Sequence, residues 1–363
     1  MRIRYQRLAA VLSAAVVVLA GCGETAAVGV QTGVDNEIQC APGTVAAQGS
    51  SAQANAINTW IKAFQAACSD ATIEYRSIGS GAGIRAFIAG TGDFAGTDAE
   101  LSAADQPQAD ARCQAGPAIH LPMVVGPIAL AYTVAGVDSL RLSPATIARI
   151  FSGQVTTWDD PAIAEENPGA ALPPTTIRTV HRSDSSGTTD SFTRFLAATV
   201  PGDWSYDSGT NWRAPGGTAE KGNDGVAAAV AQSDGSIGYM EWSYAQALNL
   251  RTASIGNRSG EFVEPSTETA ARAVADADIV GTGNDLRLRI AYTSTADGVY
   301  PIMLVTYEVV CEEGTKRESL DLVKAFLTYA ASENGQETAT RLGYSPLPER
   351  IRTRVAAAVA ALG

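Results

Sequence analysis

The chain has 363 residues, 26 of them basic and 38 acidic, and its formal net charge is −12 at pH 7. This acidic balance argues against nucleic acid as a partner, because nucleic-acid binding needs a basic surface. The composition is 45% hydrophobic and 18% charged, as in a globular protein, and the length is too great for one ordinary core and suits two lobes.

The first 21 residues have the pattern of an export signal. Three arginines precede an apolar run too short to span a bilayer comfortably, and the run ends in Leu19-Ala20-Gly21-Cys22. This ending resembles a bacterial lipobox, which implies cleavage before Cys22 and lipid on its thiol; an ordinary signal peptide is the alternative. We expect residues 1–21 to be a signal peptide, residues 22–38 a polar tether, and the protein to be extracytoplasmic and lipid-anchored to the cell membrane.

Four cysteines follow the tether: Cys40, Cys68, Cys113 and Cys311. Outside the cytoplasm an even number of cysteines indicates disulfides. Four cysteines allow three pairings, and spacing alone does not choose among them. No pair has the C-x-x-C spacing of a zinc site, so we expect no metal.

Beyond the tether, apolar strand patterns alternate with helical ones, which predicts an α/β fold. Three predicted strands end in small, polar turns that lead into helices: Gly49-Ser50-Ser51, Gly79-Ser80-Gly81-Ala82-Gly83 and Ser185-Ser186-Gly187-Thr188. Two further runs are long and apolar throughout. They are AIHLPMVVGPIALAYTV from Ala118 and VYPIMLVTYEVVC from Val299.

The two long runs suggest how the lobes are connected. A strand that passes from one lobe into another is long and apolar along its length, so we expect both runs to cross. Residues 39–124 and 301–363 are then one lobe and residues 125–300 the other, each a mixed sheet flanked by helices, with the crossing strands as a hinge. The cleft between the lobes is the expected ligand site.

This arrangement also favours one disulfide pairing. Cys113 precedes the first long run and Cys311 ends the second, so we expect both near the hinge in the first lobe. Cys40 and Cys68 flank the first strand and helix. The predicted disulfides are therefore Cys113–Cys311 and Cys40–Cys68.

The three turns share one chemistry. Each offers hydroxyls and glycine-freed N–H groups at the N-terminus of a helix, where unsatisfied donors and the positive end of the helix dipole favour an oxyanion. Singly, such a turn is more often a plain helix cap. The segment from His181 to Leu196, HRSDSSGTTDSFTRFL, adds an arginine and far more hydroxyls than one cap needs. Together the turns predict an anion cradle.

Six stretches along the chain carry a resemblance to a known family. They are GSGAGIRAFIAGTGDFAGTDAEL, IFSGQVTTWDDPAIAEENPG, RSDSSGTTDSFTRFL, KGNDGVAAAV, GSIGYMEWSYA and YPI. In this order they closely resemble the phosphate-binding lipoproteins of bacterial ABC-type phosphate importers, over nearly all of Cys40–Gly363. The resemblance implies a two-lobed, class II periplasmic-binding-protein fold and inorganic phosphate bound between the lobes. It further implies the membrane permease subunits of an ABC phosphate transporter as partners, no cofactor and no enzymatic activity.

The resemblance also implies site residues in the first lobe. The Gly-Ser-Gly turn puts a ligand hydroxyl at Ser80, and the family's Phe-x-x-Ser-Asp motif puts an acceptor carboxylate at Asp98, although this chain has Thr97 where serine is usual. The first turn departs from the family's Gly-Ala-Gly-Ser/Thr-Phe. Ser51 and the N–H of Ala52 fit the phosphate site by spacing, but the aromatic residue is absent.

The family's Arg-x-Asp-x-Ser-Gly-Thr motif falls in the second lobe. It implies phosphate binding by Arg182, Ser186, Gly187 and Thr188, with Asp184 as the partner of Arg182. An arginine suits this place because a buried dianion needs a nearly complete shell of donors, and the guanidinium adds charge and a planar fork.

An acidic residue beside an anion has a chemical reason. Phosphate near neutral pH carries at least one O–H, whereas sulfate carries none, so Asp98 could accept the ligand's proton and repel an unprotonated oxyanion. A site built to pair a ligand O–H rejects an analogue lacking it by roughly 10⁴–10⁵. A solvated loop acid is the alternative interpretation of Asp98.

Three rival functions remain. IGSGAG with Asp98 about twenty residues later suggests a dinucleotide site, but Arg85 stands where the last glycine should fall. Ser186 with His181 suggests a secreted phosphatase-like hydrolase, but no G-x-S-x-G elbow is present. Another oxyanion, such as arsenate or a phosphate ester, is the third, because protonated arsenate would also satisfy Asp98.

Overall fold

The computed structural model describes residues 38–275 and 277–363. The expected signal peptide, the attachment site Cys22 and nearly all of the expected tether therefore lie outside the described residues. All described residues belong to one compact unit of the chain. Within them, no helix is both long enough and apolar enough to cross a membrane.

A mixed sheet organises the fold, in the strand order β2-β1-β3-β14-β4-β8-β6-β7, with β9 also pairing with β4. Parallel pairs at both ends (β1 with β2 and β3, β6 with β7 and β8) are joined through antiparallel pairs in the middle. The strands are β1 Gly43–Gly49, β2 Ala71–Ser77, β3 Phe94–Thr97, β4 Ala118–Thr133, β6 Arg178–Arg182, β7 Thr218–Glu220, β8 Ser236–Glu241, β9 Arg251–Thr252 and β14 Met303–Cys311.

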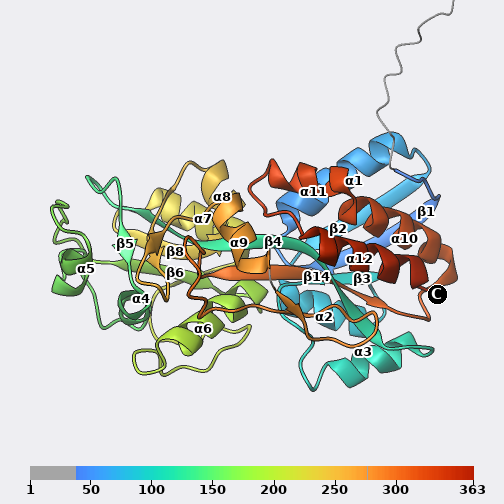
Figure 1. The fold of residues 1–363 in the computed structure, drawn as a ribbon, viewed down its shortest axis with the longest axis horizontal. Helices are drawn as coiled ribbons and strands as arrows, with labels where there is room; N and C mark the ends of the chain where they lie inside the picture. Colours follow the sequence, from blue (N-terminus) through green and yellow to red (C-terminus); the bar gives the residue numbers. More distant parts are fainter. Residues whose placement is uncertain (1–37, 276) are drawn as a thin grey trace, which may run out of the picture. The chain divides into compact units, whose positions relative to one another are not determined.

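The first long run is the strand that links the two ends of the sheet (Figure 1). Residues 118–127 of β4 pair with β14, and residues 128–133 pair with β8. The later strand β14 begins beside the point where β4 changes partners. Its first residue lies opposite Pro127, and the Ile302 carbonyl just before it accepts a hydrogen bond from the Ile128 N–H at 2.8 Å. Fifteen of the sixteen residues of β4 are buried, which explains why the run is apolar without alternation.

Helices flank each end of the sheet. The end with β1, β2, β3 and β14 carries α1 Ala54–Ala67, α2 Ser80–Ile88, α3 Gln106–Cys113, α10 Arg317–Ala331, α11 Glu333–Thr340 and α12 Glu349–Ala361. The end with β6, β7 and β8 carries α4 Pro144–Phe151, α5 Pro161–Glu166, α6 Gly187–Thr199, α7 Gly222–Gln232, α8 Trp242–Ala247 and α9 Thr267–Ala275. Short strand pairs complete the fold: β5 Arg141–Leu142, β10 Ser254–Gly256 and β11 Phe262–Val263 in one sheet, and β12 Asp278–Ile279 with β13 Leu288–Arg289 in another.

Local sequence explains where the helices begin. Ser143 caps α4 by accepting from the Thr146 N–H, and Pro144 is the first helical residue. Ser186 caps α6 in the same way through the Thr189 N–H. In α6 the side chains of Phe192, Phe195 and Leu196 are fully buried at helical spacing.

Both predicted disulfides are present, Cys40–Cys68 and Cys113–Cys311. The expectation that Cys113 and Cys311 lie near the crossing is wrong. In the β14–β4 ladder Cys311 lies opposite Ala118, at the far end of β14 from Met303, which lies opposite Pro127 at the crossing. Eight residues of extended strand separate the two ends, roughly 26 Å at about 3.3 Å per residue. The sequence-based expectation failed because β14 starts at the crossing and runs away from it.

Candidate functional site

The three polar turns predicted from the sequence meet around Asp98, at the junction of the two ends of the sheet. The Gly187 N–H, at the start of α6, donates to Ser80 Oγ, at the start of α2, over 3.2 Å. The Asn223 N–H, at the start of α7, donates to Ser51 Oγ, just before α1, over 3.1 Å. We call the assembly the polar cluster; it consists of Ser50, Ser51, Ala52, Ser80, Asp98, Arg182, Ser186, Gly187, Thr188, Asn223 and Thr306.

Two glycines permit this close approach. A Cβ on Gly187 would lie 2.5 Å from Asp98 Cβ and 2.7 Å from Ser80 Oγ, so any larger residue would separate the two turns. Gly79 has φ +92°, and a Cβ there would collide with the Asp184 carboxylate. Both glycines are therefore required for packing, and the N–H of each is already bonded, that of Gly187 to Ser80 Oγ and that of Gly79 to the Gly49 carbonyl.

Asp98 lies at the centre of the polar cluster and is 6% exposed. Its Oδ1 accepts from Ser50 Oγ at 2.5 Å and from Thr306 Oγ1 at 2.7 Å. Its Oδ2 is 3.4 Å from both Ser80 Oγ and Thr188 Oγ1. Burial raises the pKa of Asp98, and the hydrogen bonds from Ser50 and Thr306 and the charge of Arg182 act against this rise.

Arg182 supplies the positive charge beside Asp98. It is 2% exposed, and its Nε and Nη2 bind the two oxygens of Asp184 at 2.7 and 2.5 Å, so the predicted ion pair is present. Burial tends to raise the pKa of Asp184, but the hydrogen bonds and charge of Arg182 outweigh it and hold that pKa below its usual range. One edge of the guanidinium is thus occupied, while Nη1 lies 3.4 Å from Thr188 Oγ1 and faces the polar cluster.

Two hydroxyls of the polar cluster, those of Ser51 and Ser80, each accept two N–H hydrogen bonds of ordinary length. A hydroxyl carries one proton and two lone pairs, so one that accepts twice has only its proton left to offer. These hydroxyls therefore suit a ligand that accepts hydrogen bonds, as an oxyanion does. The donors are Asn223 N and Nδ2 to Ser51 Oγ, and Asp98 N and Gly187 N to Ser80 Oγ. Thr188 Oγ1 lies farther from its neighbours, 3.4 Å from both Arg182 Nη1 and Asn223 Nδ2.

Ala52 and Ser186 have local partners. The Ala52 N–H donates to Ser50 Oγ at 2.9 Å. Ser186 Oγ accepts from the Thr189 N–H at 3.1 Å, which is the usual N-cap hydrogen bond. The hydroxyl proton of Ser186 is still available to donate. The polar turn before α6 therefore both caps the helix and presents hydroxyls to the polar cluster.

Sequence reasoning missed several polar residues here. Asn223 lies in the KGNDGVAAAV stretch, so that motif was a signal for it, whereas Thr306 stood as one polar residue in an apolar strand. Ser50 was named in the first predicted turn but was given no role of its own. Two carboxyls close by, Glu241 and Glu308, were also missed because they end or interrupt apolar strands. Burial raises the pKa of each to about 8.

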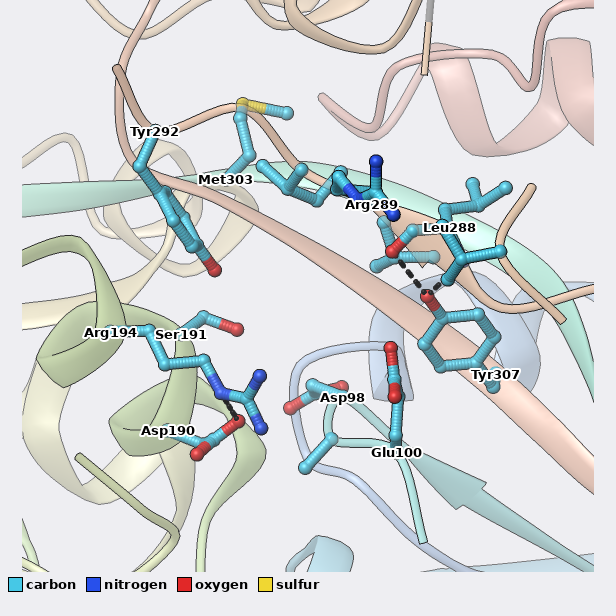
Figure 2. A pocket seen from close by; sticks show the side chains of 14 residues that line it. Asp98, Glu100, Asp190, Ser191, Arg194, Leu288, Arg289, Tyr292, Met303 and Tyr307 are labelled. Atoms are coloured by element: carbon cyan, nitrogen blue, oxygen red, sulfur yellow. Dashed lines mark hydrogen bonds and ion pairs between the residues drawn. The ribbon is translucent and has the colours of Figure 1, made fainter. Parts of the chain in front are cut away.

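A cavity of about 220 Å³ borders the polar cluster at Asp98. Figure 2 shows Asp98 with Glu100 on one side and the Asp190–Arg194 ion pair on the other, and Tyr292 beyond. Burial raises the pKa of Asp190, although the charge of Arg194 opposes the rise. Both signs of charge therefore line the cavity next to Asp98.

The geometry does not pair Ser186 with a histidine. The chain has two histidines. The His181 ring stacks on Trp212 with Nδ1 3.1 Å from the Arg182 carbonyl oxygen, and His120 lies between the Leu101 N–H and Asp285. In residues 38–275 and 277–363, no three His, Cys, Asp or Glu side chains are arranged to hold a metal ion.

A sheet whose two ends share β4, with a polar cluster at their junction, defines a two-lobed binding protein. The PBP superfamily domain matches residues 34–334. Phosphate-binding protein PstS 3 of Mycobacterium leprae is 40% identical over 352 residues, 95% of each chain, and that of Mycobacterium tuberculosis (strain H37Rv) is 39% identical over 367 residues, 99% of each. The chain belongs to this PstS family of phosphate-binding proteins.

Solved structures agree on the fold. A high-affinity periplasmic phosphate-binding protein (PfluDING), solved with bound phosphate, superposes with a TM-score of 0.69 at 23% identity, covering 86% of this chain and 93% of that one. A phosphate-binding protein of Stenotrophomonas maltophilia gives a TM-score of 0.72 at 20% identity, with the same coverage. The predicted two-lobed α/β class is confirmed.

Proposed function

We propose that the protein binds inorganic phosphate in the polar cluster and delivers it to the membrane permease subunits of an ABC phosphate importer. The observation that carries the proposal is the polarity of the polar cluster. Ser51 and Ser80 have only protons to offer, Thr188 adds a further hydroxyl, Arg182 adds positive charge, and Asp98 adds one acceptor. Dihydrogen and monohydrogen phosphate match this pattern of many donors and one acceptor.

The same pattern explains discrimination against sulfate. Sulfate carries no proton near neutral pH, so it would give Asp98 Oδ2 no donor and would place its own negative charge against the carboxylate in a buried site. An unpaired buried polar group costs about 1–3 kcal/mol, and more when it is charged. Asp98 is thereby the residue that selects for a protonated oxyanion.

The lobe boundaries belong to the same proposal. We place one lobe at residues 39–124 and 301–363 and the other at residues 125–300, with the hinge where β4 leaves β14 for β8. Residues of the polar cluster come from both parts: Ser51, Ser80, Asp98 and Thr306 from the first, and Arg182, Ser186, Gly187, Thr188 and Asn223 from the second. Ligand binding would therefore hold the lobes together.

The membrane anchor is a further part of the proposal, supported by the export pattern and the Leu-Ala-Gly-Cys ending. Residues 1–21 would be removed and Cys22 lipidated. Cys22→Ala should shift the protein from the membrane fraction to the soluble exported fraction, as judged by fractionation and immunoblotting. Retention of the variant in the membrane fraction would count against lipidation at this residue.

The decisive experiment is a calorimetric titration of the exported form with phosphate, sulfate and arsenate. We expect one phosphate per chain, strong preference over sulfate, and no turnover of a chromogenic phosphate ester. Absence of phosphate binding would refute the proposal. Preference for arsenate or for an ester would support the other-oxyanion alternative, and ester turnover would support a phosphatase-like function.

A further inference from the structure

Two hydroxyls from distant parts of the chain converge on the same oxygen of Asp98. Ser50 follows β1, and Thr306 lies in β14, 208 residues from Asp98. Their distances to Oδ1, 2.5 and 2.7 Å, lie in the range of charge-assisted O–H···O⁻ hydrogen bonds. The 3.4 Å distances from Ser80 and Thr188 to Oδ2 exceed the ordinary O–H···O range. Oδ1 is therefore saturated, and Oδ2 retains its capacity to accept.

Neither hydroxyl can donate to solvent water in place of Asp98, because Ser50 and Thr306 are both fully buried. Ser50 Oγ accepts from the Ala52 N–H, which turns its proton toward Asp98. Thr306 sits at a register shift in the β14–β4 ladder, where Met123 is the extra residue between the partners of Thr306 and Tyr307. Such bulges change the direction of neighbouring side chains.

We propose that Ser50 and Thr306 are positioning residues that hold Asp98 as a carboxylate with Oδ1 saturated and Oδ2 reserved for the proton of the ligand. This inference rests on the proposed function and assigns the selectivity of the site to a supporting pair as well as to Asp98. Without either donor, Asp98 protonates more readily. A protonated carboxyl donates a hydrogen bond, and that suits sulfate.

The positioning role is best tested at a pH where the other titratable groups around Asp98 keep one protonation state. Burial raises the pKa of Glu241 and Glu308 to about 8, so both carboxyls are neutral from pH 5 to 7. Burial also raises the pKa of Tyr75 and Tyr244, which stay neutral as well. The groups facing Asp98 are Arg182 of β6, Glu241 of β8, Glu308 of β14, Tyr75 of β2 and Tyr244 of α8, and Glu100, Asp190 and Arg194 line the adjoining cavity.

The experiment measures phosphate affinity by calorimetry and sulfate affinity by competition with phosphate, at pH 5, 6 and 7. Sulfate is the probe for pH because it carries no proton over this range. Thr306→Val and Ser50→Ala each remove one donor from Oδ1. We expect the phosphate-to-sulfate affinity ratio at pH 7 to fall at least about tenfold in each, the scale of one hydrogen bond to a charged group. The gain of sulfate affinity on acidification should begin at a higher pH than in the wild type, because the carboxyl that has lost a donor protonates more readily.

Two further variants separate positioning from general packing. Thr306→Ser keeps the hydroxyl and should keep the wild-type ratio and pH profile. Thr193→Val removes a buried hydroxyl that bonds only the Thr189 and Asp190 carbonyls and the Gly209 N–H, and it should also leave both unchanged. If Thr306→Val does not unfold cooperatively, Ser50→Ala and Thr306→Ser decide the matter.

The outcomes distinguish the two levels of the hypothesis. A wild type that fails to bind phosphate refutes the proposed function. A wild type that binds phosphate and excludes sulfate, combined with Ser50→Ala and Thr306→Val ratios within threefold of wild type and unmoved pH profiles, refutes only the positioning role. An equal loss of selectivity in Thr193→Val also refutes it, because selectivity would then follow from loosening of the fold.

Discussion

Replacing Asp98 by asparagine tests the proton-acceptor mechanism directly. The change removes the charge and keeps the shape. Because Ser50 and Thr306 both donate to Oδ1, the amide oxygen must take that place, and the NH₂ must take the place of Oδ2. The variant therefore offers the ligand a donor at the point where the wild type offers an acceptor.

The magnitude follows from the contacts that change. Phosphate loses one O–H···O⁻ hydrogen bond but also loses repulsion from the carboxylate, so its affinity should weaken only modestly. Sulfate loses the repulsion and gains a donor. A hydrogen bond to a charged group contributes about 1.5–3 kcal/mol. We expect Asp98→Asn to lower the phosphate-to-sulfate affinity ratio at least about 100-fold, about 2.7 kcal/mol.

Calorimetric titrations of wild type and Asp98→Asn with both anions at pH 7 measure this ratio. Asp93→Asn is a matched control, since Asp93 is a buried acid that bonds the Ala46 N–H and Ser319 Oγ and takes no part in the polar cluster. Its ratio should equal that of the wild type. A ratio unchanged in Asp98→Asn would place discrimination elsewhere and remove Asp98 from the mechanism.

Arg182→Ala should cost several kcal/mol of phosphate binding in calorimetry, the scale for stripping one partner from a buried charge pair; an affinity within about threefold of wild type would contradict the assignment. Removing the Cys113–Cys311 disulfide by a double serine substitution should lower the free energy of unfolding by a few kcal/mol, up to about 5 kcal/mol for a loop of this length, and equal denaturation midpoints would exclude this. Burial raises the folded-state pKa of Glu308 to about 8, above its unfolded value, so its contribution to stability is present below about pH 4.5 and is lost as pH rises toward 8. Thermal unfolding should therefore show a fall in wild-type stability on the order of a few kcal/mol from pH 5 to 8 and a smaller fall in Glu308→Gln, and identical slopes would refute the shift.

Local pattern was sufficient for much of the fold and part of the site. The strand-to-helix turns at Ser51, Ser80 and Ser186 were visible because each combines small residues with a change from strand to helix periodicity. The long apolar run that forms β4 predicted a strand that passes from one lobe into the other. Sequence periodicity reflects residues that are close along the chain, and both the turns and the long strand are determined by such residues.

The supporting residues of Asp98 could not be predicted in this way. Thr306 is one hydroxyl in an apolar strand, and β-branched threonine is also a common strand residue. Only the pairing of β14 with β3, antiparallel and far apart in sequence, brings it to Asp98. Glu308 and Glu241 were missed for the same reason, because the burial of an acid is decided by the strands that cover it.

The Cys113–Cys311 bond joins residues 198 positions apart, so the chain between them is a closed covalent ring. A protease that cuts once within the ring, for example near the exposed side chains of Asp207 or Arg213, opens the ring without releasing a fragment. The nicked chain runs as one molecule under oxidising conditions and as two after reduction. A single cut in this part of the chain therefore leaves both pieces covalently attached until the disulfide is reduced.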